Sequence, residues 1–297
     1  MSEPNFFIIG APKCGTSAMH EYLAKHPQVF MTDVKEPHHF STDMPGRNGY
    51  FCPIEYRELF KSATSKHLVR GESSVYYLYS RVALSRIVTQ YPDAKFVAML
   101  RNPIELTQSL HGQLQTSLTE DEPDFRTAWN LQEARARGEH LPSTCIEPSY
   151  LQYREIGLLG QQMRRALDVI DSSNLLTIMF DDFCRHPERS YAQVLNHLGL
   201  KHDGQSQFPR VNVRTTLRYR WLRNVLDQRR LPAWMRRCGR RMGLHKLHAS
   251  LTSWNEVPQP RPQLQPEFRR ELASVFLDDV KLLSRLVGHD LTHWLST

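Results

Sequence analysis

A lysine, two glycines and two hydroxyl residues lie together in the stretch GAPKCGTSA, residues 10–18, directly after the apolar run FFII. Gly10 and Gly15 have the spacing of the phosphate-binding motif G-x-x-x-x-G-K-[ST], but Thr16 stands where that motif has its lysine. The lysine of this stretch is Lys13, three residues earlier. In a strand–loop–helix unit, backbone N–H groups and the helix N-terminus surround an anion, and glycines let the backbone approach it closely. The residue types therefore predict a site for a phosphate-like group.

An arginine provides a second candidate anion site. Arg101 directly follows the apolar run KFVAML, residues 95–100, at a place where a nucleoside triphosphatase would carry an acidic magnesium ligand. A guanidinium suits bidentate binding of phosphate. Because Pro103 favours a helix start, Ser109 lies about two turns into that helix, where its hydroxyl can share the anion. The pattern predicts a ligand with two separate phosphate groups.

The cysteines and histidines do not form a metal-ligand pattern. The five cysteines are odd in number, scattered and never spaced as C-x-x-C, which argues against a disulfide framework and a structural zinc site. The close pair His38 and His39 would point in different directions on a strand or helix. We expect reduced thiols, no metal and a cytoplasmic protein, because we see neither a signal peptide nor an apolar run of about 20 residues.

The elements that must position these residues follow a βαβ rhythm. Short apolar or β-branched runs alternate with helical periodicity up to Gly199. This alternation favours an α/β fold with a P-loop-like, doubly wound parallel sheet flanked by helices, whose ligands bind beyond the carboxyl ends of the strands. The expected strands span residues 6–10, 68–71, 95–100 and 175–180, and the expected helices span residues 16–26, 81–90, 103–117, 125–137, 154–170 and 188–198.

A strongly basic segment follows this alternation. Residues 210–246 hold eleven Arg and one Lys against a single acid, Asp227, whereas the whole chain has a net charge of +7. Such a segment can contact a membrane surface or another anionic partner, or it can be a helix with a solvated face. Both interpretations predict a helical segment, because apolar residues such as Trp221 and Leu226 accompany the arginines.

A proline-rich stretch, WNEVPQPRPQLQP, separates the basic segment from a last predicted helix over residues 267–287. Its prolines cannot continue a helix and favour extended backbone. We expect one domain over residues 1–297, with an α/β core over about 5–200 and a helical C-terminal extension over about 210–297.

Two of these stretches, in the longer forms IIGAPKCGTSAM and RNPIELTQS, occur together with KEPHHF (35–40), GESSVYYL (71–78) and FDDFCRHPERSYAQVLNHLGL (180–200). Together they resemble the sulfotransferases that use 3′-phosphoadenosine 5′-phosphosulfate (PAPS), in the branch of glycan-acting and bacterial enzymes. The first is similar to the family's 5′-phosphosulfate loop and the second to its 3′-phosphate motif. KEPHHF resembles the segment with the catalytic glutamate, and the last two resemble the G-E-x-[ST]-P-x-Y strand and a later strand–helix unit.

The resemblance implies an activity and a set of roles. Such an enzyme moves a sulfuryl group by in-line displacement from PAPS to a hydroxyl or amine of a carbohydrate, glycolipid or other metabolite, without magnesium, and leaves adenosine 3′,5′-bisphosphate (PAP). Glu36 would be the general base, with His38 or His39 as its rival, and Lys13 would stabilise the departing phosphate. The 3′-phosphate would be held by Arg101 and Ser109, and the 5′-phosphosulfate by Lys13, Cys14, Gly15, Thr16, Ser17 and Ala18.

Some positions depart from the family's pattern. Ser73 stands where some glycan-acting members carry a basic residue against the acceptor, and Val75 replaces a proline. Glu72, on the same apolar strand, is either structural or in contact with the acceptor. Arg214 and Arg261 are candidate ligands in a C-terminal lid over the 3′-phosphate.

Two other functions compete with sulfuryl transfer. A kinase would use Asp181, after LLTIMF, as its magnesium ligand, although the displaced lysine and Arg101 weigh against it. A non-catalytic module would bind RNA or an anionic polymer through residues 210–246. We favour a small-molecule or glycan acceptor, anionic or lipid-linked, with no nucleic acid, with peripheral membrane contact through 210–246 and with acceptor-contacting loops around 112–150. The sequence does not indicate an oligomeric state.

Overall fold

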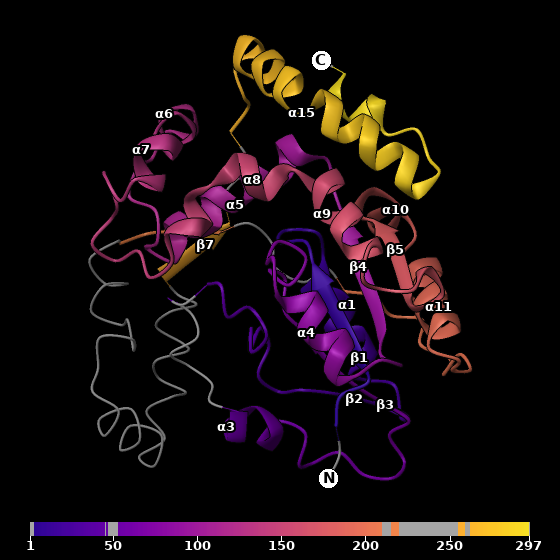
Figure 1. The fold of residues 1–297 in the computed structure, drawn as a ribbon. Coiled ribbons are helices and arrows are strands. Elements are labelled where there is room, and N and C mark those ends of the chain that lie inside the picture. Colours follow the sequence, from indigo (N-terminus) through magenta and orange to yellow (C-terminus); the bar gives the residue numbers. More distant parts are fainter. Residues whose placement is uncertain are drawn as a thin grey trace.

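Five parallel strands form the central sheet of the protein, in the order β2–β3–β1–β4–β5 (Figure 1). The predicted α/β class with a doubly wound parallel sheet is confirmed. The computed structural model describes residues 3–44, 46, 53–209, 215–219, 255–258 and 262–296. The strands of the sheet are β1 (Phe6–Gly10), β2 (Val29–Met31), β3 (Val69–Ser73), β4 (Lys95–Leu100) and β5 (Leu175–Met179).

The two central strands are apolar along their length because both faces of the sheet are covered. All five residues of β1 are buried, as are the last five of β4. Strands of parallel sheets are commonly buried on both faces, which removes the alternation of apolar and polar residues. Phe7 of β1 pairs with Phe96 of β4, and their rings stack with centroids 5.7 Å apart. The bounds of β1 and β4 are those predicted from the sequence, residues 6–10 and 95–100.

Three strands of the sheet differ from the sequence prediction, and β5 differs only in ending at Met179 instead of residue 180. β2 is only three residues long, too short to show a period, and the prediction omits it. β3 begins at Val69 and continues past the predicted end at residue 71 to Ser73. This extension places Glu72 and Ser73 on the strand, where they pair with Phe7 and Ile8 of β1.

The sheet reverses its winding between β1 and β4. From β1 the chain passes through α1 (Thr16–Leu23) to β2, on one side of the sheet, whereas from β4 it continues to β5, on the other side. In doubly wound sheets the ligand crevice lies at the carboxyl ends of such strands. The loop after β1 is fastened to β4 by a hydrogen bond from the Ala11 N–H to the Met99 carbonyl, 2.7 Å long. The loop at 10–18 and Arg101 therefore lie at the same edge.

Two predicted helices are each divided in the structure. Leu131 separates α6 from α7 within 125–137, and Leu158 separates α8 from α9 within 154–170. The prediction omits α3 and α10, while its other helices are present with shifts of a few residues. Besides α1, the helices are α3 (Pro53–Glu58), α4 (Ala83–Gln90), α5 (Pro103–Thr116), α6 (Phe125–Asn130), α7 (Gln132–Ala136), α8 (Tyr153–Gly157), α9 (Leu159–Leu167), α10 (Phe180–Arg185), α11 (Pro187–His197) and α15 (Pro266–Val287), with short 3₁₀ turns η1 (Pro148–Leu151), η2 (Ser172–Asn174) and η4 (Thr292–Leu295).

The C-terminal helix α15 is attached to the core through a buried carboxylate. Asp279 accepts hydrogen bonds from the backbone N–H groups of Gly160 (2.7 Å) and Gln161 (2.9 Å), at the first turn of α9. These groups have no partner within a helix, so Asp279 acts as their cap. A side chain at Gly160 would meet the Asp279 carbonyl at 2.3 Å, so the helices approach too closely for any larger residue. Figure 1 shows α15, in yellow, running beside α9.

The described part of the basic segment is a strand, which corrects the helical prediction there. β6 (Thr215–Leu217) pairs antiparallel with β7 (Glu256–Pro258). β-branched residues favour strand pairing, and the Asn255 side chain accepts from the Tyr219 N–H (2.9 Å) and donates to its carbonyl (3.0 Å). The remainder of residues 210–246 lies outside the described residues, so the single domain over 1–297 stays a prediction.

None of the helices in the described ranges combines the length and apolar character needed to span a membrane. Within those same ranges, His, Cys, Asp and Glu side chains do not gather into a group of three or more that would suit a metal ion.

A buried ion pair organises the region between α5 and α9. The Arg135 guanidinium donates to both carboxylate oxygens of Glu120, at 2.6 and 2.7 Å, and neither side chain is exposed to solvent. The Tyr153 hydroxyl donates to the same carboxylate at 2.6 Å. Although burial opposes ionisation, the Arg135 and Tyr153 hydrogen bonds hold the pKa of Glu120 below its usual value. The pair therefore keeps both charges.

Replacing Glu120 by Gln should lower the free energy of unfolding by about 3–5 kcal/mol, because the buried Arg135 guanidinium then keeps only the exposed Asp121 carboxylate, 4.0 Å away, as a counter-charge. Urea unfolding followed by circular dichroism measures the change. The exposed pair of Arg137 and Glu139, 3.0 Å apart, offers a matched control, and Glu139→Gln should leave the unfolding midpoint unchanged. A Glu120→Gln shift as small as that of the control would contradict this role.

Candidate active site

The loop between β1 and α1 has the geometry of an anion cradle. Gly15, its last residue, adopts φ +85°, and a side chain there would meet the Phe183 ring at 2.8 Å, so glycine is required. Gly15 is also the N-cap of α1, and it provides no side-chain hydrogen bond to the first turn. Among the described residues, the N–H groups of that turn therefore lack a side-chain cap, and they can bind an anion.

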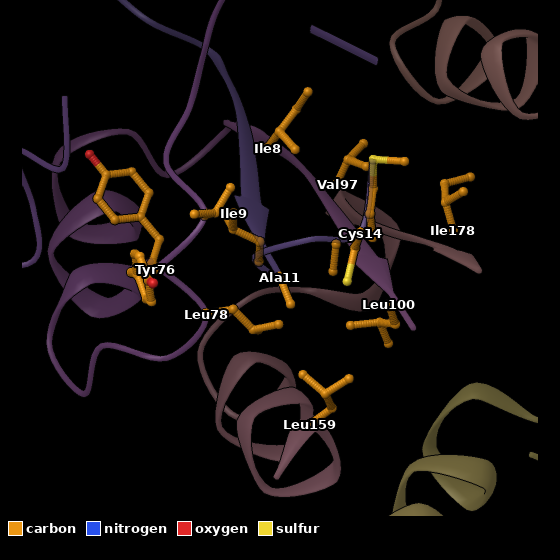
Figure 2. Packing of buried hydrophobic residues seen from close by; sticks show 14 of the residues in the cluster. Ile8, Ile9, Ala11, Cys14, Tyr76, Leu78, Val97, Leu100, Leu159 and Ile178 are labelled. Carbon is orange, nitrogen blue, oxygen red and sulfur yellow. The ribbon is translucent and has the colours of Figure 1, made fainter. Parts of the chain in front are cut away.

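The predicted ligands of this loop differ in burial. Cys14 is fully buried, its thiol donates to the Pro12 carbonyl at 3.3 Å, and burial raises the thiol pKa to about 12. Figure 2 shows Cys14 in the packed cluster with Ala11, Val97 and Leu100. Its side chain anchors the loop to the core, so only its backbone N–H could meet a ligand. Thr16 and Ala18 are also buried, whereas Lys13 and Ser17 are partly exposed.

Arg101 lies against the same loop. Its guanidinium donates to the Lys13 carbonyl at 3.1 Å and to the Glu105 carboxylate at 2.8 Å, and it lies over the Phe180 ring at 4.3 Å from the centroid. Arg101 is only 7% exposed, and its Nε has no hydrogen-bond partner in the described structure. A buried donor without a partner is costly, so this group is available to a ligand.

The end of the chain packs beside Arg101. The neighbouring Asn102 caps α5 through a 2.9 Å bond from the Ile104 N–H, and it also donates to the Trp294 carbonyl. The Trp294 indole in turn donates to the Asp181 carboxylate at 3.2 Å. Asp181, the magnesium ligand of the kinase alternative, is thus bound to an indole. Ser109 lies in α5, as expected, and is half-buried.

The surroundings of Lys13 disfavour its charged form. Burial, together with the nearby charges of Arg101 and Lys35, lowers the pKa of Lys13 to about 8, although Glu36 opposes the shift. Its ammonium accordingly lacks the counter-charge that would restore an ordinary pKa. An incoming anion would provide that charge.

The segment KEPHHF places Glu36 beside His38. The Lys35 ammonium lies 2.6 Å from one oxygen of the Glu36 carboxylate, and the His38 Nε2 lies 3.4 Å from the other. The charge of this carboxylate raises the pKa of Lys13, in the loop after β1. Glu36 and His38 both have positive φ, at 60° and 50°, which non-glycine residues rarely adopt.

His39, the other candidate base of this segment, packs against a tyrosine. Its ring stacks on Tyr56 with centroids 4.2 Å apart and an interplanar angle of 7°. Burial lowers its pKa, so it is neutral near pH 7. The structure thus brings His38, rather than His39, to the Glu36 carboxylate, and a catalytic role for His39 stays a prediction.

Glu72 is structural in this arrangement. It is fully buried, and its carboxylate accepts from the hydroxyls of Tyr77 (2.7 Å), Ser74 (2.7 Å) and Tyr56 (3.3 Å). Burial raises the pKa of Glu72 to about 7 in spite of these donors. The sequence reasoning missed Ser74 and Tyr77 as partners, and the available signal was the close spacing of Glu, Ser and Tyr within GESSVYYL.

The two positions near β3 that depart from the family's pattern, Ser73 and Val75, are both buried. Ser73 is fully buried and its hydroxyl lies 2.9 Å from Nδ1 of His20, whose pKa burial lowers to about 4. Val75 is 5% exposed. The lid candidates Arg214 and Arg261 lie outside the described residues.

Comparison with known proteins points to one family. Residues 79–204 match the model of the sulfotransferase family. A solved structure titled as a sulfotransferase from Alicyclobacillus acidocaldarius aligns over 100% of both chains, with a TM-score of 0.73 and 27% identity. The chain belongs to the sulfotransferase family. The predicted membership is therefore confirmed, and the anion cradle and Arg101 occur in a protein of that family.

Curated sulfotransferases match in part. The membrane-associated sulfotransferase kil1 of Dictyostelium discoideum is 32% identical over 36% of this chain and 22% of its own length. Heparan sulfate glucosamine 3-O-sulfotransferase 6 of Homo sapiens is 28% identical over 67% of this chain and 53% of its own length. The chain thus spans between about a fifth and about a half of the length of these relatives.

Proposed function

We propose that this member of the sulfotransferase family transfers the sulfuryl group of PAPS to a hydroxyl or amine of a carbohydrate or a related metabolite. The observation that carries the proposal is the contact between Arg101 and the Lys13 carbonyl, 3.1 Å long. It joins a guanidinium with an unsatisfied Nε to a loop with uncapped N–H groups. Two adjoining anion-binding groups suit a ligand with two phosphates.

The described residues fit such a nucleotide. The open first turn of α1 and the Lys13 ammonium would hold the 5′-phosphosulfate, with hydroxyls from Thr16 and Ser17. Arg101, with Ser109 from α5, would hold the 3′-phosphate. The nearby Asp181, the magnesium ligand of the kinase alternative, is bound to the Trp294 indole.

The proposed roles follow from charge. Glu36 would accept the proton that the acceptor group loses, and Lys35 and His38 hold its two carboxylate oxygens in place. Lys13 and the loop N–H groups would stabilise the charge that grows on the leaving phosphate. In-line transfer with a loose transition state needs chiefly such positioning and charge stabilisation.

The acceptor class rests on relatives. One is called a carbohydrate sulfotransferase and another a heparan sulfate glucosamine 3-O-sulfotransferase. By analogy we propose a carbohydrate acceptor, bound by loops around 112–150. An anionic or lipid-linked acceptor, membrane contact through 210–246, a cytoplasmic location and the single domain also stay predictions.

PAP should bind without magnesium, and Arg101→Ala should weaken binding roughly 10- to 150-fold, the equivalent of about 1.5–3 kcal/mol for hydrogen bonds to a charged group. Isothermal titration calorimetry with and without Mg²⁺ measures this. Glu105→Gln removes the ion-pair partner of Arg101, which lies in the first turn of α5, and is the control; it should leave binding equal or tighter. Binding of ATP only with Mg²⁺ would favour a kinase instead.

PAP affinity should fall as the pH rises above about 8. Because the ligand-free protein has a lowered Lys13 pKa of about 8 and the anion favours the ammonium form, binding above that pH takes up a proton. The decline approaches about tenfold per pH unit. Titrations from pH 7 to 9.5 test this, and Lys13→Met should bind weakly with no such slope. An equal slope in that variant would assign the proton to another group.

Glu36→Gln should lower turnover of radiolabelled PAPS by about 10²- to 10⁴-fold, as expected for loss of a general base, while PAP affinity changes little. Turnover is measured on the acceptor identified from a panel of carbohydrates. Asp33→Asn, an exposed carboxylate three residues earlier, is the matched control and should retain activity. Unchanged turnover in Glu36→Gln would move the base role to His38.

A further inference from the structure

The loop that carries Glu36 is held in an unfavourable backbone conformation. Glu36 and His38 both have φ in the left-handed region, with Pro37 between them. A non-glycine residue in this region costs about 1 kcal/mol or more and persists where the surroundings over-determine it. The surroundings of this loop must therefore provide the restraint.

Three alternate backbone N–H groups of the loop donate to one neighbouring segment. The Glu36 N–H donates to the Ser73 carbonyl at 2.9 Å, and the His38 N–H donates to the Ser74 hydroxyl at 3.0 Å. The Phe40 N–H reaches the Tyr77 hydroxyl at 3.4 Å. The last two acceptors are side-chain oxygens, so they hold the loop only when each hydroxyl hydrogen points away from it.

Glu72 determines where those hydrogens point. Its buried carboxylate accepts from both hydroxyls, Ser74 at 2.7 Å and Tyr77 at 2.7 Å. An ionised carboxylate can only accept, so each hydroxyl donates to Glu72 and keeps its lone pairs for the loop. A further donor, the Tyr56 hydroxyl at 3.3 Å, fixes the carboxylate, and Tyr56 also stacks on His39 of the same loop.

We propose that Glu72 is a positioning residue that orients the Ser74 and Tyr77 hydroxyls toward the backbone of residues 36–40 and so holds Glu36 in place. It acts through these hydroxyls and contacts neither nucleotide nor acceptor. The inference rests on the proposed function for its effect on turnover. Its effect on the loop is independent of that function.

The substitution Glu72→Gln tests the direction of these hydrogen bonds, because it replaces the carboxylate by an amide of nearly the same shape. Its NH₂ group must donate to one of the two hydroxyls, whose own hydrogen then competes with the loop N–H or stays unsatisfied. At pH 8 the wild-type carboxylate is mostly ionised, since its pKa is about 7. Amide hydrogen exchange followed by mass spectrometry, with a peptide over residues 30–45, reports on the loop directly.

Glu72→Gln should accelerate exchange in that peptide at least about tenfold. Turnover should fall roughly 10- to 100-fold, as for a catalytic group displaced by about 1 Å, while PAP affinity stays within about twofold. Ser74→Ala should reproduce both effects, and the double variant should be no worse than the larger single variant, because the two residues act in one network. Asp279→Asn, another buried carboxylate that caps α9, is the control for general destabilisation.

Three results would overturn the inference: unchanged exchange over residues 30–45 in Glu72→Gln, acceleration spread over the chain as in Asp279→Asn, or additive losses in the double variant. If wild type itself shows no turnover with PAPS, the proposed function fails. Local acceleration in Glu72→Gln would still support the positioning of the loop, so the two failures are distinguishable.

Discussion

The hydrogen bond from Arg101 to the Lys13 carbonyl is the contact on which the arrangement of the site depends. It is possible only because β1 and β4 are neighbours whose connections leave in opposite directions, so that both strand ends open on one crevice. The same contact holds the Lys13 carbonyl against the guanidinium, in the loop whose N-cap glycine leaves the first turn of α1 without a side-chain cap. Sheet topology, loop conformation and charge thus place two anion-binding groups side by side in this sulfotransferase family member.

A second constraint concerns the residue proposed as base. Glu36 and His38, on either side of Pro37, both have positive φ, a backbone conformation that residues other than glycine rarely adopt. The conformation is held from outside, by the strand β3 and the turn after it. Local strain and distant support together place a carboxylate next to Lys35 and His38. The anion cradle and the base therefore depend on different parts of the sheet.

Much of the fold and of the candidate site was predictable from short local sequence patterns. The apolar runs of β1 and β4, the glycine spacing of the loop and Arg101 after β4 are local signals, and the structure brings these residues together. The contact between the Glu72 network and the loop of Glu36 was not predictable, because it joins His38 to a hydroxyl 36 residues away in the sequence. Likewise β2 is too short for a period, and the β6 strand depends on pairing with residues about 40 positions away.

The ion pair of Glu120 and Arg135 has a consequence for how this architecture can diversify. Its charges are satisfied almost wholly by residues 120–153, without help from the sheet. The segment around it is thus a platform whose buried charges are neutralised within the segment, while Phe125 and Trp129 pack on α15. Loops on such a platform can change in length and chemistry while the loop after β1 and Arg101 stay the same. One fold can in this way serve many acceptors.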